Sequence, residues 1–202
     1  MPPNQDMESI PTQLQSVLLI RHGETEWNCA NKRQGWRDSA LTSTGKVQMA
    51  NVRLPINATG PIFTSDLGRA ISSAKIIAKR YQYPVITLKC LREQRFTASN
   101  AQCCPDFWRK NESAAQLQSR VLRGLTQVIN YPSSGPKVIV GHGEWIRMAI
   151  AACTPNLDIS QVSLPSNGSI TQLSISRRTL TPLDNSSLMT AALPHQAKRG
   201  AA

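Results

Sequence analysis

Two of the three histidines in the chain stand in equivalent local settings. His22 lies two residues after the apolar run 17–20, in LLIRHGETEWN, and His142 lies two residues after the run 137–140, in VIVGHGEWIR. Each is followed by glycine, which lets the backbone come close to a ligand. Near neutral pH an imidazole can act as a nucleophile, a proton carrier or a metal ligand. The repeated setting indicates one shared site rather than two unrelated structural histidines.

Arginines accompany both histidines. Arg21 precedes His22, and Arg69 opens a helical pattern after a third apolar run at 61–64. Guanidinium groups pair bidentately with phosphate oxygens and keep their charge at working pH. We therefore expect Arg21, His22, Arg69 and His142 to form an oxyanion site. A metal site is less favoured, because the arginines would repel a cation and no third ligand is evident. The chain has no G-x-S-x-G motif of a serine hydrolase.

The elements that must position these side chains alternate along the chain. Apolar runs or alternating patterns predict strands at 17–20, 61–64, 84–88, 137–140 and 169–176, the last of them near a sheet edge. Helical spacing and capping residues predict helices from 42 or 43 to about 53, from about 67 with Ser65 or Asp66 as its cap, over 112–130 and after 142. The polar stretch between the first strand and Ala40 is predicted to be a loop. Such alternation predicts an α/β layer fold, whose ligands bind beyond the carboxyl ends of the parallel strands.

The length and composition fit one globular domain. We expect a domain over 16–178, a disordered N-terminus over 1–15 and a flexible basic tail over 179–202. No window approaches the run of ~18 apolar residues that a membrane-spanning helix needs. The N-terminus lacks the layout of a signal peptide. We therefore expect a cytoplasmic protein with no membrane partner.

The net charge of +11 calls for an anionic partner. Nucleic acid is a minority interpretation, because no basic run is long enough for a binding arm and the basic residues do not alternate with aromatics. The five cysteines form no C-x-x-C pair and are expected to be reduced thiols. A metal or redox role for the adjacent Cys103 and Cys104 is disfavoured, because no histidine stands beside them.

Several stretches together resemble one family. RHGETEWN resembles the signature of the histidine phosphatase superfamily, the phosphoglycerate-mutase-like proteins, in which the histidine of R-H-G is phosphorylated. Further stretches resemble family motifs in the same order: QGWRDSALTSTG, TSDLGRAISSAKIIA, LRE, VGHGEWIR and SNGSITQL. The resemblance spans about residues 17–176. It implies a phosphoglycerate-mutase-like fold, a three-layer α/β/α sandwich with a mostly parallel central sheet.

The resemblance also implies roles. His22 is the expected nucleophile, with its tautomer fixed by the backbone carbonyl of Gly23. Arg21, Arg69 and His142 are expected to hold the phosphate oxygens. Two further expected donors are the Asn28 side chain and the backbone N–H of Gly143. No metal or cofactor is expected, because the arginines neutralise the phosphate.

Glu93, in LRE, stands where many family members carry the acid that protonates the leaving oxygen. A carboxyl beside phosphate is pushed toward its protonated form, which suits this role. The alternative is a surface ion pair of Glu93 with Arg92 or Arg95. Glu24 and Glu144 are weaker candidates for the same proton.

The segment after LRE departs from the family pattern. Many relatives continue with something like F-G-x-W-E-G, whereas this chain has QRFTASNAQCCPDFWRK. We expect either an ordinary covering loop or a substrate wall. In a wall, an apolar face would come from Phe96, Phe107 and Trp108, and a second anionic group would meet Arg95, Arg109 and Lys110.

The sequence therefore favours a metal-independent histidine acid-type phosphatase, a phosphoric monoester hydrolase acting on a small phosphorylated metabolite. One alternative is a phosphoglycerate-mutase-like phosphotransferase or a bisphosphatase. Another is a phosphate-binding regulatory protein with little turnover. The oligomeric state is left open, with a dimer as one option.

Overall fold

A computed structural model describes residues 14–96 and 111–176 of the chain. Its first strand begins at Leu14, inside the stretch that we had assigned to a disordered N-terminus. The rest of that stretch and the predicted basic tail lie outside the described residues. Within the described residues, no helix is long and apolar enough to cross a membrane.

A five-stranded sheet occupies the centre of the described structure, with strand order β3-β2-β4-β1-β5. Neighbouring strands are parallel except for β5, which runs antiparallel to β1 at one edge. The strands are β1 (Leu14–Arg21), β2 (Ile62–Thr64), β3 (Val85–Thr87), β4 (Lys137–Gly141) and β5 (Ile170–Ser176). The predicted mostly parallel sheet, with its last strand at an edge, is confirmed.

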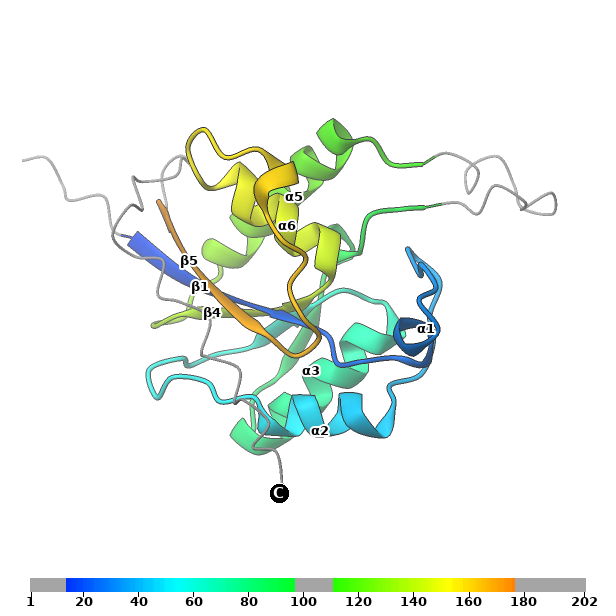
Figure 1. Cartoon of the computed structure of the whole chain (residues 1–202). Helices are drawn as coiled ribbons and strands as arrows, with labels where there is room; N and C mark the ends of the chain where they lie inside the picture. Colours follow the sequence, from blue (N-terminus) through cyan, green and yellow to red (C-terminus); the bar gives the residue numbers. More distant parts are fainter. Residues whose placement is uncertain (1–13, 97–110, 177–202) are drawn as a thin grey trace, which may run out of the picture.

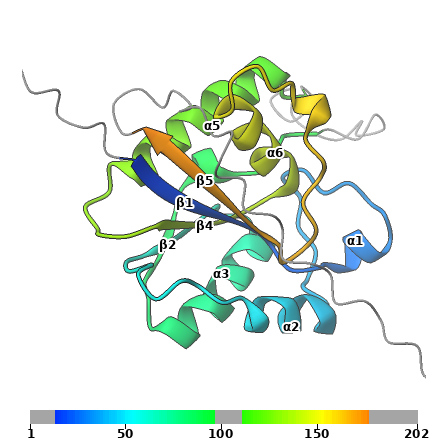
Figure 2. The same ribbon diagram turned by 60° about the vertical axis from the view of Figure 1, so that its left-hand side comes forward.

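Helices cover both faces of this sheet (Figures 1 and 2), so the three-layer prediction is also confirmed. Helices α2 (Ser43–Asn51) and α3 (Gly68–Tyr81) lie on one face, and α5 (Ala114–Ile129) and α6 (Gly143–Ala152) lie on the other. Three short elements join them: α1 (Glu26–Cys29) and the 3-10 turns η1 (Lys89–Leu91) and η2 (Ile159–Gln161). The sequence had predicted only a polar loop at α1, where Thr25 caps a single helical turn.

The apolar run of β1 is continuous because the strand is buried on both faces. Val17 and Leu19 belong to the core beneath α5 and α6. Leu18 and Ile20 belong to the second core, beneath α2 and α3. Two packed layers therefore fix the strand that ends at Arg21.

Candidate active site

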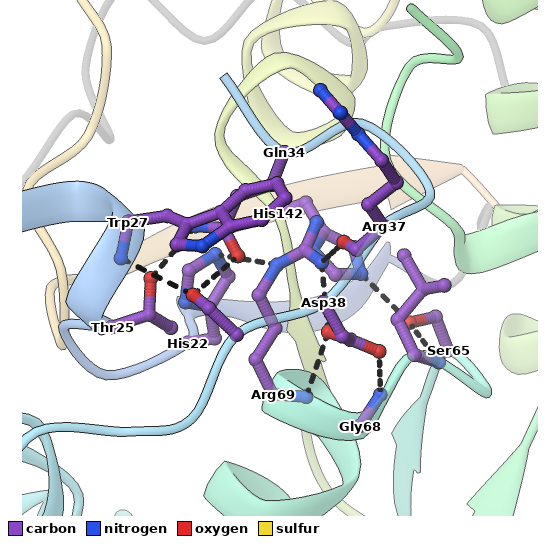
Figure 3. A network of polar contacts seen from close by, with 12 residues as sticks. His22, Thr25, Trp27, Gln34, Arg37, Asp38, Ser65, Gly68, Arg69 and His142 are labelled. Carbon is purple, nitrogen blue, oxygen red and sulfur yellow. Dashed lines mark hydrogen bonds and ion pairs between the residues drawn. The ribbon is translucent and has the colours of Figure 1, made fainter. Parts of the chain in front are cut away.

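The register of β1 and β4 brings the two histidines together. Arg21 pairs with Gly141 at the carboxyl ends of these parallel strands, and the His22 N–H donates to the Gly141 carbonyl at 3.0 Å. The next residues, His22 and His142, are both buried, with ring centroids 5.4 Å apart (Figure 3). The two histidines with equivalent settings in the sequence thus lie side by side at the carboxyl ends of β1 and β4.

Two neighbours set the protonation of the His22 ring. Nδ1 lies 2.8 Å from the Gly23 carbonyl, which can only accept, so Nδ1 carries the hydrogen. Nε2 therefore keeps its lone pair, and it accepts a hydrogen bond from Arg69 Nε at 3.2 Å. Burial, followed by the charge of Arg69, lowers the pKa of His22 to about 3. The ring is neutral at physiological pH, as a nucleophile must be.

Arg69 is held by backbone carbonyls as well as by a carboxylate. Its Nη1 donates to the Arg37 carbonyl at 2.7 Å and to Asp38 Oδ1 at 2.9 Å, and its Nη2 donates to the Gly35 carbonyl at 2.8 Å. With Nε on His22, four of the five N–H groups have partners among the described residues, and one Nη2 hydrogen is left for a ligand.

The α3 terminus that carries Arg69 is capped differently from the prediction. Sequence reasoning proposed Ser65 or Asp66 as the cap. Instead Asp38, from a separate loop, accepts the first two backbone N–H groups of α3 (Figure 3). Asp66 pairs with Arg92. The Asp38 carboxylate fixes both the helix terminus and the guanidinium.

Two buried nitrogens at this site have no hydrogen-bond partner within the described structure: Arg21 Nε and His142 Nδ1. Arg21 Nη1 donates to the Pro165 carbonyl at 2.6 Å, which orients the guanidinium. His142 Nε2 lies 2.7 Å from the Ser65 hydroxyl. If that hydroxyl donates, His142 Nδ1 carries the hydrogen. A buried donor left unpaired is costly, so an anionic ligand is the natural acceptor for both nitrogens.

The predicted donors Asn28 and Gly143 line the same cleft. Asn28 Oδ1 accepts from the Thr25 N–H (3.1 Å), the Thr25 hydroxyl (2.9 Å) and Asn167 Nδ2 (3.3 Å). These bonds fix the amide so that its NH₂ group remains for a ligand. Gly143 is the first residue of α6, whose opening N–H groups have no partner inside the helix. A Cβ on Gly143 would lie 2.7 Å from Leu164 Cδ1, so a side chain here would have to displace the half-exposed Leu164 side chain.

Glu93 lies at the N-terminus of α6. Its carboxylate accepts the backbone N–H groups of Gln94 (2.8 Å), Trp145 (3.2 Å) and Glu144 (3.4 Å). Burial raises the pKa of Glu93, against the opposing effects of the Gln94 N–H and the Arg69 charge. Arg92, one of the surface partners considered for it, pairs with Asp66 instead.

A cleft of about 350 Å³ is lined by most of these groups, whereas His142 lies behind His22 and is not part of the lining. The lining includes Arg21, His22, Arg69, Asn28, Glu93 and Gly143. Glu144 also lines it, but Arg147 binds that carboxylate at 3.0 Å. Among the described residues, no three His, Cys, Asp or Glu side chains gather as metal ligands would.

The comparison with known families agrees with this geometry. The family model described as the histidine phosphatase superfamily (branch 1) matches residues 17–184. The chain belongs to the histidine phosphatase superfamily. It is similar to "Probable phosphoglycerate mutase GpmB" of Proteus mirabilis, with 36% identity over 150 residues, which cover 63% of this chain and 69% of that protein.

Solved structures of other proteins share the fold. YhfR of Bacillus stearothermophilus has a TM-score of 0.67 at 24% identity, covering 80% of this chain and 92% of that one. This likeness concerns the fold alone. A phosphoglycerate mutase from Thermus thermophilus has a TM-score of 0.59 at 26% identity, covering 79% and 92% of the two chains.

The site also contains residues that sequence reasoning had given no role in the chemistry. Asn167 donates to the His22 carbonyl at 3.0 Å and to Asn28, and Ser65 orients His142. Asp38 holds Arg69. All three stand inside the stretches that resemble family motifs, which was the only available signal.

The predicted wall is described only in part. Phe96 lines the cleft, whereas Arg95 is absent from its lining and lies over the Trp36 ring, 5.3 Å from the centroid. The remaining candidates, Phe107, Trp108, Arg109 and Lys110, lie outside the described residues, as do Cys103 and Cys104.

Proposed function

We propose that this histidine phosphatase hydrolyses a small phosphomonoester through a phosphohistidine on His22, without a metal ion. One observation carries the proposal. Beside His22, whose Nε2 keeps a lone pair that at present accepts from Arg69, both Arg21 and His142 have a buried nitrogen without a protein partner in the described part of the chain.

In the first step, oxygens of the bound phosphate accept hydrogen bonds from Arg21, His142 and the Asn28 amide. The Arg69 Nε–H moves from His22 Nε2 to a phosphate oxygen, which frees the lone pair. Nε2 then attacks phosphorus in line with the leaving oxygen, and the P–O bond breaks. Glu93 gives its proton to that oxygen, so the product leaves as an alcohol.

In the second step, the Glu93 carboxylate takes a proton from water as the water oxygen attacks the phosphohistidine. The P–N bond breaks, its electron pair returns to Nε2, and inorganic phosphate leaves. Fixed arginine charges stabilise the phosphoryl group in both steps. In many other phosphoryl-transfer enzymes a metal ion provides this stabilisation.

A second candidate is a mutase, favoured by the names of the Proteus mirabilis relative and of the Thermus thermophilus structure. The first step would be the same. The phosphohistidine would then react with a hydroxyl of a bound phosphoglycerate instead of with water.

One assay distinguishes these candidates. The full chain is incubated with a panel of phosphomonoesters, and separately with 3-phosphoglycerate and 2,3-bisphosphoglycerate, in a chelating buffer. Inorganic phosphate from the panel supports the phosphatase, and 2-phosphoglycerate in the second reaction supports the mutase. If neither inorganic phosphate nor 2-phosphoglycerate forms, both activities are contradicted and a phosphate-binding regulator is favoured. His22→Ala is the control for contaminating enzymes.

A further inference from the structure

The cleft carries more positive charge than one phosphate group needs. Arg21 and Arg69 line the phosphate end, and Lys32 and Arg33 also line the cleft. In the proposed mechanism Arg21 and Arg69 bind the phosphate group, and Arg69 also pairs with Asp38. Lys32 and Arg33 are two further cations.

Neither remaining cation is paired with an acid in the described part of the chain. The two acids of the lining, Glu93 and Glu144, have other hydrogen-bond partners. Glu144 is bound by Arg147, and Glu93 accepts three backbone N–H groups and has a raised pKa. Lys32 and Arg33 are thus available to a ligand.

The turn that carries these cations is anchored. Its neighbour Gln34 is buried and donates to the Thr25 hydroxyl at 2.7 Å. Gly35 has φ +54°, and a Cβ there would lie 3.1 Å from the Phe96 backbone nitrogen. The turn therefore packs closely against the segment that follows Glu93.

Arg33 itself lies over an aromatic ring. Its guanidinium carbon is 4.6 Å from the centroid of Phe96, which also lines the cleft. A cation–π contact orients a guanidinium but leaves its N–H groups available. Trp27 and Leu164 add apolar surface to the lining.

We infer that Lys32 and Arg33 form a subsite for a second anionic group of the substrate, a carboxylate or a second phosphate. The inference rests on the proposed function. The substrate class is then a phosphomonoester that carries a second anionic group, joined to the phosphate by a short, partly apolar body. Arg95, which the sequence had suggested for this role, lies over Trp36 instead.

The experiment measures binding rather than turnover, so that it is independent of catalysis. Isothermal titration calorimetry compares benzylphosphonates that carry a carboxylate at ring position 3 or 4 with the uncharged carbamoyl compounds of the same shape. We expect at least one carboxylate to bind about tenfold more tightly than its carbamoyl partner. The ratio should shrink as salt is added. A third compound with a second phosphonate in place of the carboxylate shows which anion the subsite prefers.

A matched pair of variants locates the effect. The Lys32→Gln, Arg33→Gln double variant should bring the ratio close to one. The Lys79→Gln, Arg80→Gln double variant removes the same charge from an exposed Lys-Arg pair at the end of α3, outside the cleft, and should keep the wild-type ratio. Equal affinities of wild type for the charged and uncharged compounds, or equal effects of both double variants, would overturn the inference. Failure of the proposed function would appear separately, as tight binding without phosphate release from any ester.

Discussion

The Nε–H of Arg69 points at the Nε2 of His22 across 3.2 Å. The nitrogen that we propose as nucleophile is therefore covered by the arginine that is to stabilise the phosphate. Together with the Gly23 carbonyl on Nδ1, this contact holds the ring by both nitrogens. Substrate must take the arginine's hydrogen bond before the lone pair can react.

Arg69→Lys should lower kcat/KM on the order of 10³-fold. An ammonium group cannot reach two loop carbonyls, Asp38 and His22 at once, as the planar guanidinium does. Steady-state kinetics on an aryl phosphate measure the loss. Arg80→Lys, at the exposed end of the same helix, is the control. Near-wild-type activity of Arg69→Lys would remove Arg69 from the mechanism.

Glu93→Gln should slow hydrolysis of alkyl phosphates by about 10²- to 10⁴-fold and affect 4-nitrophenyl phosphate much less. A poor leaving group needs the proton, and nitrophenolate does not. Because burial raises the pKa of Glu93, the wild-type rate on alkyl phosphates should fall as pH rises through that pKa. The variant should lack this dependence. Glu144→Gln is the matched control, because Glu144 is the other carboxyl that lines the cleft. If Glu144→Gln slows alkyl phosphates, relative to 4-nitrophenyl phosphate, more than Glu93→Gln does, Glu144 is the proton donor.

Arg120 should act through Glu93 as a positioning residue. On α5 it binds Glu112 through two nitrogens, and it donates to the carbonyls of Cys90 (3.0 Å), Arg92 (2.6 Å) and Glu93 (3.1 Å). Three of its five N–H groups thus hold the turn that bears the acid, and the other two bind Glu112. Arg120→Lys should lower kcat on alkyl phosphates roughly tenfold, with a smaller change in KM and in nitrophenyl phosphate turnover.

A purely structural role of Arg120 would give a different result. The Arg120–Glu112 pair is largely buried, with side chains 11% and 9% exposed. Its loss could lower the melting temperature without any effect on leaving-group dependence. Equal rate losses on both substrates would contradict the positioning role, and melting curves of each variant provide the stability control.

The chain should lose stability as pH falls below about 6.5. The pKa of His22 is about 3 in the folded chain, against an ordinary value of 6.5. Between these values the unfolded chain binds a proton that the folded chain does not, so stability falls with falling pH. From pH 7 to pH 5 the expected loss from His22 is on the order of 1 to 2 kcal/mol.

Urea titrations at the two pH values measure this loss. His22→Gln should show a smaller loss than wild type, although His142 contributes in the same direction because burial also lowers its pKa. An equal loss in wild type and variant would show that His22 does not titrate in this way.

The fold and the centre of the site were predictable because their signals are local. The apolar run before Arg21 is continuous because both faces of β1 are buried, and the repeated His-Gly turn reflects the parallel pairing of β1 with β4. Strands and helices therefore came close to their observed bounds. The remaining site residues were assigned through the family motifs, which occur in this chain in the same order as in the family.

The partners of the site were not predictable, since they depend on tertiary contacts. Asp38 reaches the terminus of α3 from a loop about 30 residues away, which no capping pattern within the helix sequence reveals. The sequence also could not show which basic residues line the cleft. Basic residues are frequent in this chain, and only packing separates Arg33, at the cleft, from Arg95, on Trp36.

The central claim is a covalent phosphohistidine on His22. Wild-type chain is quenched with alkali during turnover of a ³²P-labelled phosphomonoester, because phosphohistidine survives base and is lost in acid. The labelled peptide is then identified by mass spectrometry. We predict base-stable label on the peptide that contains His22, and none in His22→Ala. Label on another residue, or steady turnover without any labelled intermediate in rapid-quench samples, would contradict the account.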